Sequence, residues 1–497
     1  MIKAVLATRR GVIPKHLHFH DPNPAIDWDR LPLQVTTDLT EWPRRNGRPR
    51  LAGVNSFGIS GTNAHIVLEE YVSPDTAPGK QYQAAGCAQM SAVSLPADVA
   101  QLPLPEQEMG PRKIRFLPLS AKSEYALREL AGRYLSWLGE PAGEMAGEMG
   151  GDGAVPEPLL ADMAWTAGAG RSHFEYRTGI AFHDAGSLQE RLRELAETGE
   201  VAKSRPVNKV AFVYTGQGSQ WAGMGQALYE SEPVAKAVLD HCETVFRDER
   251  GTSLLDVMFA RAGTEGKLGD TAWEQPALFA LECALTALWS SVGIRPGVVM
   301  GHSVGELAAA HTAGVFSLQD GMRFACARGA LLSATEPGAM SAVFAPAPQV
   351  AAEVRAANKL STGIGVNIST DNGTHQVISG PVDEVETIMK RLEAQGTRAR
   401  RLNTAKTFHS ALVEPALDAL ETSLDGVKTG PPSLAVVSNL TGRVVKSGQA
   451  LDGTYWRRHA REPVAFARGV GTLAELGVDL VLEIGPHAVL APMALSA

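Results

Sequence analysis

The chain has 497 residues, of which 44% are apolar and 20% are charged, and its net charge is −8. This length allows about two or three domains of ordinary globular composition, and the negative charge gives no basic field for nucleic acid. No apolar stretch reaches the ~18 residues of a membrane span, and the N-terminus lacks the long apolar core of a signal peptide. We therefore expect a cytoplasmic protein without a membrane partner.

The first 207 residues are predicted to form three successive regions. Residues 1–72 end in a strand-like run at Ile66–Glu70, and residues 73–112 are rich in Ala, Pro, Gly and Gln without an apolar period, which indicates a flexible linker. Residues 113–207 alternate between strand and helix patterns and predict a small α/β domain. Its expected elements are a strand at Ile114–Lys122, a helix at Ser123–Gly139, an apolar segment at Leu159–Trp165, a strand at Tyr176–His183, and a flexible loop at Gly139–Gly153.

A glycine-rich turn follows the next predicted strand. Lys209–Tyr214 is an apolar run typical of a buried strand, and it continues into Gly216–Gln220, which reads GQGSQ. The glycines leave the backbone amide of Gln217 free to face a negatively charged oxygen. This amide is a candidate donor for an oxyanion hole.

The most informative segment is Gly301–Gly305, which reads GHSVG. The apolar run Val298–Met300 ends just before it and Glu306–Gly314 can continue as a helix, so Ser303 is predicted to lie on a strand-to-helix turn. The glycines remove side chains that would collide in a tight turn, and the amide of Val304 would be the second oxyanion donor. This arrangement is typical of acyl transfer through a serine ester. The alternative is that Ser303 is only a helix cap.

Arg328 lies in residues 318–332, whose apolar spacing is helical and whose place after the turn would bring the guanidinium back toward Ser303. A planar guanidinium matches a carboxylate with two parallel hydrogen bonds, so we expect a substrate with a free carboxylate. The alternative is a surface arginine on an amphipathic helix.

Residues 338–403 predict a ferredoxin-like insertion, in the order strand, helix, strand, strand, helix, strand. We expect it to lie over the core, with the active cleft between the two. The elements are expected at Met340–Ala345, Pro348–Lys359, Ile364–Ser369, Gln376–Ser379, Val382–Gln395 and Thr397–Asn403.

Taken together, these segments resemble one family, the malonyl-CoA:acyl-carrier-protein acyltransferases, in the form found as a domain of modular polyketide synthases. The matching pieces cover about residues 208–495 and are, in order, Gly216–Gln220, Gln275–Leu278, Gly301–Glu306, Arg328–Gly329, Phe408–Ser410 and Glu483–His487. The resemblance implies an α/β fold, with an α/β-hydrolase-like core and a ferredoxin-like subdomain in residues 208–497.

The N-terminal regions carry a resemblance of their own. Residues 1–72, with Gly11–His18 and Asn55–His65, are similar to the C-terminal end of a ketosynthase, and residues 113–207 are similar to the linker between ketosynthase and acyltransferase. The ketosynthase cysteine and catalytic histidines lie outside the part that residues 1–72 resemble, so we assign no condensing activity, and His65 is expected to be structural.

The resemblance also implies roles for individual residues. Of the 13 histidines, His409 would be the general base for Ser303, which needs one because a serine hydroxyl is a weak nucleophile. His302 and Gln275 would be polar contacts to the substrate. A backbone carbonyl would orient the imidazole of the base, and we place it at His459.

The residues ending at His409 bear on the choice of acyl unit. In this family a His-Ala-Phe-His form accompanies malonyl and a Tyr-Ala-Ser-His form accompanies methylmalonyl, whereas this chain has Lys406-Thr407-Phe408-His409. Phe408 would fill the space that an α-methyl group needs, which favours malonyl. Lys406 departs from both forms and could meet either a polar substituent or the phosphates of CoA, so methylmalonyl and other substituted malonyl units remain alternatives.

The sequence therefore predicts a ping-pong acyltransferase that moves a malonyl unit from CoA through Ser303 to the phosphopantetheine thiol of an acyl carrier protein, within a larger polyketide synthase. CoA is a substrate, the phosphopantetheine belongs to the carrier, and no bound cofactor is expected. The cysteines, at positions 87, 242, 283 and 326, have no metal spacing, so we expect no metal. The alternatives are a serine hydrolase or thioesterase, and a non-catalytic docking fragment.

Overall fold

The computed structural model describes residues 1–44, 48–58, 61, 63–70, 98–105, 114–139, 157–199, 201, 203–361 and 363–496. The chain divides into two units, residues 1–91 and residues 92–497. Most of the predicted linker at 73–112 and of the predicted loop at Gly139–Gly153 lies outside the described residues.

The first unit contains one helix and two short antiparallel pairs. Helix α1 (Ile2–Arg10) precedes β1 (Val12–Ile13), which pairs with β2 (Thr40–Glu41), and β3 (Leu51–Phe57) pairs with β4 (Asn63–Glu69). The predicted strand at Ile66–Glu70 is the second half of β4. Glu70 follows it and accepts hydrogen bonds from the side chains of Arg44 and Arg50, so a buried carboxylate holds the ends of this hairpin.

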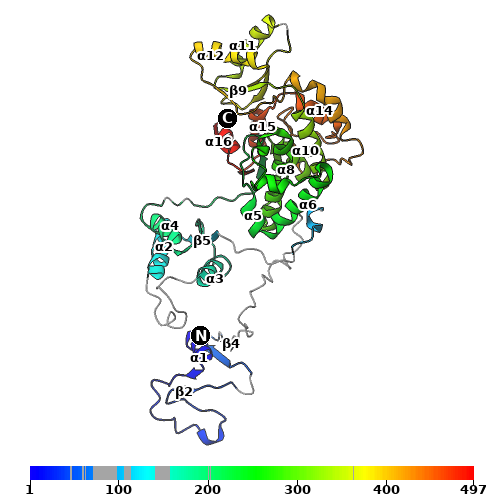
Figure 1. The fold of residues 1–497 in the computed structure, drawn as a ribbon. Coiled ribbons are helices and arrows are strands. Elements are labelled where there is room, and N and C mark those ends of the chain that lie inside the picture. Colours follow the sequence, from blue (N-terminus) through cyan, green and yellow to red (C-terminus); the bar gives the residue numbers. More distant parts are fainter. Residues whose placement is uncertain are drawn as a thin grey trace. The chain divides into compact units, whose positions relative to one another are not determined.

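Residues 114–199 form a small α/β arrangement with its own apolar core. An antiparallel pair, β5 (Arg115–Ala121) and β6 (Tyr176–Phe182), is accompanied by α2 (Glu124–Gly139), α3 (Glu157–Ala169) and α4 (Ala185–Glu197) (Figure 1). Alternate residues of β5, among them Leu117 and Leu119, are buried against leucines of α2 and α4. The two predicted strands and the predicted helix of this region are confirmed, and the segment Leu159–Trp165 is part of α3.

The core of residues 203–496 is a four-stranded parallel sheet in the order β13-β8-β7-β14. Its strands are β7 (Val210–Tyr214), β8 (Val298–Gly301), β13 (Ala435–Val437) and β14 (Leu480–Ile484). Around it lie α5 (Gln226–Ser231), α6 (Pro233–Arg250), α7 (Leu254–Met258), α8 (Thr271–Ser291), α9 (Gly305–Thr312), α10 (Leu318–Ser333), α13 (Leu417–Thr422), α14 (Gly453–Arg461), α15 (Phe466–Glu475) and α16 (Leu490–Ser496).

The central strands are buried on both faces, as expected for a parallel sheet covered by helices. Phe212 and Tyr214 of β7 pack into the large cluster formed with α6, α8, α9 and α10, whereas Ala211 and Val213 face the cluster that includes Phe466 and Leu473 of α15. Figure 1 shows α6, α8 and α10 side by side. Alternate residues of β7 thus pack against helices on opposite faces of the sheet. The carboxyl ends of the neighbouring strands β7 and β8 lie side by side.

The ferredoxin-like insertion is present in residues 339–401. Its antiparallel sheet has the order β10-β11-β9-β12, with two helices in the connections (Figure 1). The elements are β9 (Ala339–Val343), α11 (Ala347–Leu360), β10 (Asn367–Asp371), β11 (Gln376–Gly380), α12 (Val382–Ala394) and β12 (Ala399–Arg401). The predicted order of elements is confirmed, with bounds that differ by at most three residues.

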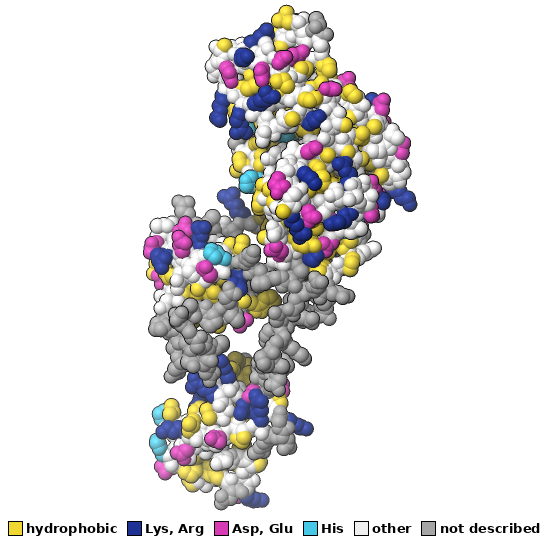
Figure 2. Space-filling view, in the orientation of Figure 1, with side chains coloured by type: hydrophobic (Ala, Val, Ile, Leu, Met, Phe, Trp, Pro, Cys, Tyr) yellow, Lys and Arg dark blue, Asp and Glu magenta, His cyan; other side chains and the backbone are white. Residues whose placement is uncertain are grey.

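Acidic and basic side chains are interspersed over the visible face of residues 203–496 (Figure 2). Within the described ranges, no helix is both long and apolar enough to cross a membrane.

Candidate active site

The turn between β8 and α9 holds Ser303 in a backbone conformation that few side chains adopt. Its φ is 52°, and a non-glycine residue in this left-handed region costs about 1–3 kcal/mol. The flanking glycines permit two close approaches: a Cβ on Gly301 would lie 2.1 Å from the amide nitrogen of Glu306 within the turn, and one on Gly305 would lie 2.3 Å from the carbonyl oxygen of Thr215, just after the neighbouring strand β7. The strained turn has the backbone geometry of the predicted nucleophile elbow.

The hydroxyl of Ser303 contacts a histidine rather than capping the helix. Its Oγ lies 2.8 Å from Nε2 of His409, and the N-cap of α9 is Val304, without a side-chain cap. Nδ1 of His409 lies 2.8 Å from the carbonyl oxygen of Glu462. Because a carbonyl only accepts, Nδ1 carries the proton and Nε2 is free to accept from the serine hydroxyl.

His409 is kept neutral by its surroundings. Burial lowers its pKa to about 3, and the positive charge of Arg328 acts in the same direction, while the Glu462 carbonyl opposes both. Its φ of 56° is also in the left-handed region, and its backbone amide donates to the carbonyl of Ala460 at 3.2 Å. A neutral imidazole beside a serine hydroxyl is the form that a general base requires.

The carbonyl that orients His409 is that of Glu462, not that of His459 as the sequence analysis placed it. Helix α14 ends at Arg461, and Glu462 leaves it in an extended conformation. Its carbonyl is therefore released from the helical hydrogen-bond pattern and can turn to the imidazole. The backbone of His459 exerts a weaker effect in the same direction on the His409 pKa.

The two predicted oxyanion donors come from adjacent loops. Tyr214 at the end of β7 pairs with Gly301 at the end of β8, so the loops carrying Gln217 and Val304 leave the same edge of the sheet. Within the described ranges, neither of these two backbone amides donates a hydrogen bond to another residue. The side chain of Gln217 donates to Thr271 Oγ1 at 2.8 Å and to Glu274, which anchors the loop while leaving its amide available.

Arg328 is a buried cation with one edge unpaired. Its side chain is on α10, where only 1% of the residue is exposed, and its Nη1 donates to Oε1 of Gln275 at 2.6 Å. Nε and Nη2, buried as well, have no hydrogen-bond partner among the described residues. Burial lowers its pKa to about 10. Since unpaired buried donors are costly, this edge is suited to receive an anionic ligand.

Gly329, the residue after Arg328, allows α10 to pack close to α8. A Cβ on Gly329 would lie 2.8 Å from the carbonyl oxygen of Thr271, the first residue of α8. The missing side chain lets α10 approach α8 closely, and this approach brings Arg328 against Gln275.

Comparison with known sequences and structures agrees with this geometry. A sequence profile described as "Acyl transferase domain" matches residues 211–496, more than half of the chain. The chain belongs to this acyltransferase family. Profiles described as "Ketoacyl-synthetase C-terminal extension" and "RhiE-like, KS-MAT linker domain" match residues 22–144 and 118–199. The acyltransferase is thus preceded by ketosynthase-derived sequence, as predicted, while the boundaries at 72, 112 and 207 stay predictions.

The acyltransferase is similar to parts of much longer synthases. It is 38% identical to polyketide synthase GfsA of Streptomyces halstedii, over 99% of this chain and 6% of that protein. It is 35% identical to the PKS-NRPS hybrid synthetase ATPKS of Aspergillus niger, over 100% of this chain and 25% of that protein. The chain therefore spans a quarter or less of the length of these relatives.

Solved acyltransferases share the fold. The acyltransferase domain from module 8 of the salinomycin polyketide synthase is 30% identical, covers 78% of this chain and 88% of its own, and has a TM-score of 0.68. FabD from Acinetobacter baumannii is 26% identical, covers 59% of this chain and 92% of its own, and has a TM-score of 0.53. The predicted fold class, an acyltransferase core with a small subdomain, is confirmed.

Three further predicted site residues of the acyltransferase make contacts with groups other than the side chains of Ser303 and His409. Nζ of Lys406 donates to the carbonyl oxygen of Thr335, just beyond α10, so the ammonium is tied to the protein rather than held out toward a ligand. Phe408 is buried in the large core cluster. Nε2 of His302 lies 3.2 Å from Oδ1 of Asn372, in the turn between β10 and β11, so this imidazole links the elbow to the small subdomain.

Sequence reasoning missed a set of buried polar residues around the elbow. They are Asn439, Glu306, Tyr455 and Ser438, each at most 4% exposed. The sequence offers one signal for them, the placement of Glu306 one turn after the nucleophile. Asn439 simply follows a strand, and nothing in its local pattern indicates that it reaches Ser303.

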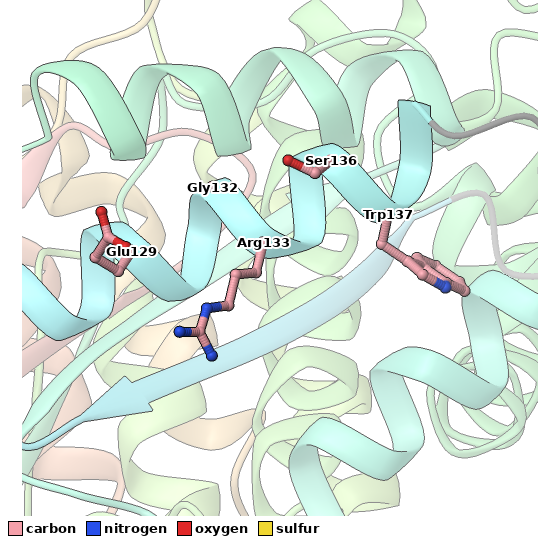
Figure 3. A pocket seen from close by; sticks show the side chains of 5 residues that line it. All are labelled: Glu129, Gly132, Arg133, Ser136 and Trp137. Carbon is pink, nitrogen blue, oxygen red and sulfur yellow. The ribbon is translucent and has the colours of Figure 1, made fainter.

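A second hollow among the described residues lacks this chemistry. The pocket in Figure 3 lies along α2 and is lined by Glu129, Gly132, Arg133, Ser136 and Trp137. No histidine stands beside its serine, so it offers no nucleophile–base pair. Across the described ranges, no group of three or more His, Cys, Asp or Glu side chains could hold a metal ion.

Proposed function

We propose that this acyltransferase moves a malonyl unit from CoA, through an ester on Ser303, to the phosphopantetheine thiol of an acyl carrier protein within a polyketide synthase. The observation that carries the proposal is the unpaired Nε–Nη2 edge of Arg328, buried near enough to His409 to lower its pKa. A serine hydrolase needs no such cation, whereas a malonyl group carries the carboxylate that the cation would bind.

In the first half-reaction, Nε2 of His409 takes the proton of Ser303 as Oγ bonds to the thioester carbon. The resulting oxyanion is stabilised by the amides of Gln217 and Val304. The carbon–sulfur bond then breaks, and the CoA sulfur leaves with the proton from His409. The product is a malonyl ester of Ser303 and free CoA.

The second half-reaction is the reverse, with a different thiol. The phosphopantetheine sulfur gives its proton to His409 and bonds to the ester carbon, and the Ser303 oxygen leaves with that proton. Since both thiols use one site in turn, the kinetics are ping-pong. The enzyme supplies no cofactor, because phosphopantetheine is attached to the carrier.

We favour malonyl over methylmalonyl because Phe408, next to the base, would fill the space that an α-methyl group needs. The direct test is intact-protein mass spectrometry after incubation with malonyl-, methylmalonyl-, acetyl- and butyryl-CoA, followed by addition of a carrier protein or a pantetheine thiol. We expect a malonyl adduct that the thiol removes faster than water does. No adduct with any thioester, or loss to water at an equal rate, would contradict the proposal.

Arg328→Ala should reverse the preference between acyl groups. Truncating one partner of a desolvated charge pair costs about 2–5 kcal/mol, so kcat/KM for malonyl-CoA should fall by roughly 30- to 4,000-fold. Activity toward acetyl-CoA should rise relative to malonyl-CoA, because an apolar acyl end no longer strands an unpaired guanidinium. Measuring kcat/KM for both thioesters with both proteins checks this.

The matched control is Arg323→Ala, which removes an exposed arginine of the same helix whose partner is Glu249. It should leave both substrates unaffected, since exposed ion pairs contribute little. Equal losses for the two thioesters in Arg328→Ala would mean that Arg328 supports the fold rather than the choice of substrate.

A further inference from the structure

The side chain of Asn439 bridges the backbone of the nucleophile elbow. Asn439 lies two residues beyond β13, the strand next to β8 in the sheet. Its Oδ1 accepts from the backbone amide of Ser303 at 2.7 Å, and its Nδ2 donates to the carbonyl oxygen of Gly301 at 2.8 Å. The single carboxamide of Asn439 therefore pairs with both the N–H of Ser303 and the C=O of Gly301, in the way that the backbone of a neighbouring β-strand pairs with an N–H and a C=O.

Asn439 is itself fixed from both sides of its backbone. Its amide donates to Oε2 of Glu306 at 2.6 Å, and its carbonyl accepts from the amide of Ala465 at 2.8 Å. Glu306 in turn accepts from the hydroxyl of Tyr455, which lies 2.7 Å from Oγ of Ser438. Because these groups are buried, loss of one partner would leave another unsatisfied.

The bridge acts on the residue whose backbone is strained. The left-handed φ of Ser303 persists only if surrounding contacts hold it, and the elbow glycines permit this conformation without enforcing it. The amide of Ser303 donates to Asn439, and the next amide, that of Val304, has no hydrogen-bond partner among the described residues. Rotation of the Ser303 backbone would move Oγ away from His409 and turn the Val304 amide at the same time.

We propose that Asn439 is a positioning residue that holds the elbow in its reactive conformation, and that Glu306 positions Asn439. Both polar atoms of the Asn439 carboxamide are engaged by the backbone of the elbow, so Asn439 acts through the direction of Ser303 Oγ and of the Val304 amide. The inference rests on the proposed function, in which Ser303 is the nucleophile.

The test compares Asn439→Ala with Asn358→Ala. Asn358 also bridges a backbone amide and carbonyl, both of Val366 in the small subdomain, at 2.9 and 2.8 Å. The rate of malonyl-ester formation should be measured in a single turnover as a function of malonyl-CoA concentration, together with the thermal unfolding midpoint. Asn439→Ala should lower the maximal rate by roughly ten- to a hundredfold, because small misplacements of reacting groups are costly. The half-saturating concentration should stay near that of the wild type, since Arg328 and Gln275 are untouched.

Asn358→Ala should lower the midpoint and leave the maximal rate unchanged. The inference would be overturned if folded Asn439→Ala reacts at a maximal rate within twofold of the wild type. It would also be overturned if only the half-saturating concentration of malonyl-CoA changes. If Asn439→Ala does not fold, Glu306→Gln carries the test: a lower maximal rate at unchanged half-saturation supports the positioning role, and an unchanged rate refutes it. A wild-type protein that forms no adduct would instead refute the proposed function.

Discussion

Replacing Ser303 by alanine should abolish the acyl adduct completely, the largest effect that we expect from any single substitution. The Ser303 Oγ is the atom that lies 2.8 Å from the unprotonated Nε2 of His409, and alanine has no group that can form the ester. Incubation with malonyl-CoA and intact mass spectrometry will show an unmodified protein if this is correct. An adduct that survives Ser303→Ala would place the covalent chemistry at another residue.

The control separates catalysis from helix capping. Ser253 caps α7 by accepting from the amide of Asp256 at 3.0 Å, so Ser253→Ala removes a true cap. It should destabilise the protein by about 0.5–2 kcal/mol and leave the adduct intact. Loss of the adduct in both variants would indicate that the assay reports folding alone.

His409→Ala should lower the rate of acylation by on the order of a hundredfold or more, the usual size of a lost general base. Single-turnover reactions with malonyl-CoA, quenched at a series of times, will measure this acylation rate. His302→Ala is the comparison, because His302 contacts Asn372 rather than the nucleophile, and its loss should be smaller. If the two variants rank in the opposite order, the base is misassigned.

The pH profile provides an independent check on the base. An imidazole acts as a base only when neutral, and burial holds the pKa of His409 well below its usual 6.5, at about 3. A bound malonyl carboxylate would offset part of the Arg328 charge and raise this pKa, but burial, the larger cause, persists. The acylation rate should therefore stay level as the pH falls from 8 through 6.5. A rate that halves near pH 6.5 would mean that the base is solvated.

Much of the fold could be predicted because it depends on local pattern. Apolar runs bounded by glycines predicted β7 and β8, and helical spacing predicted α10, whose observed bounds are Leu318–Ser333. The ferredoxin-like order of elements followed in the same way. These signals lie within a few residues along the chain, so the sequence alone carries them.

At Gly301 the elbow was also determined locally, since a Cβ there would meet the backbone of the turn itself, whereas Gly305 is needed because the end of β7 packs against it. The pairing of Ser303 with His409, 106 positions apart, followed from family resemblance and not from any local pattern. The distance between the two atoms, and the neutral state that burial imposes on the imidazole, come from the packing of the whole domain.

The tertiary structure alone decided which backbone and buried polar groups serve the site. The carbonyl that orients His409 belongs to Glu462 and not to His459, because α14 ends one residue before Glu462 and releases its carbonyl. Lys406 is tied to the carbonyl of Thr335, and Asn439 reaches Ser303 across neighbouring strands. A residue's own side chain carries no signal for where its carbonyl points or which distant amide it will meet, because chain packing sets these directions.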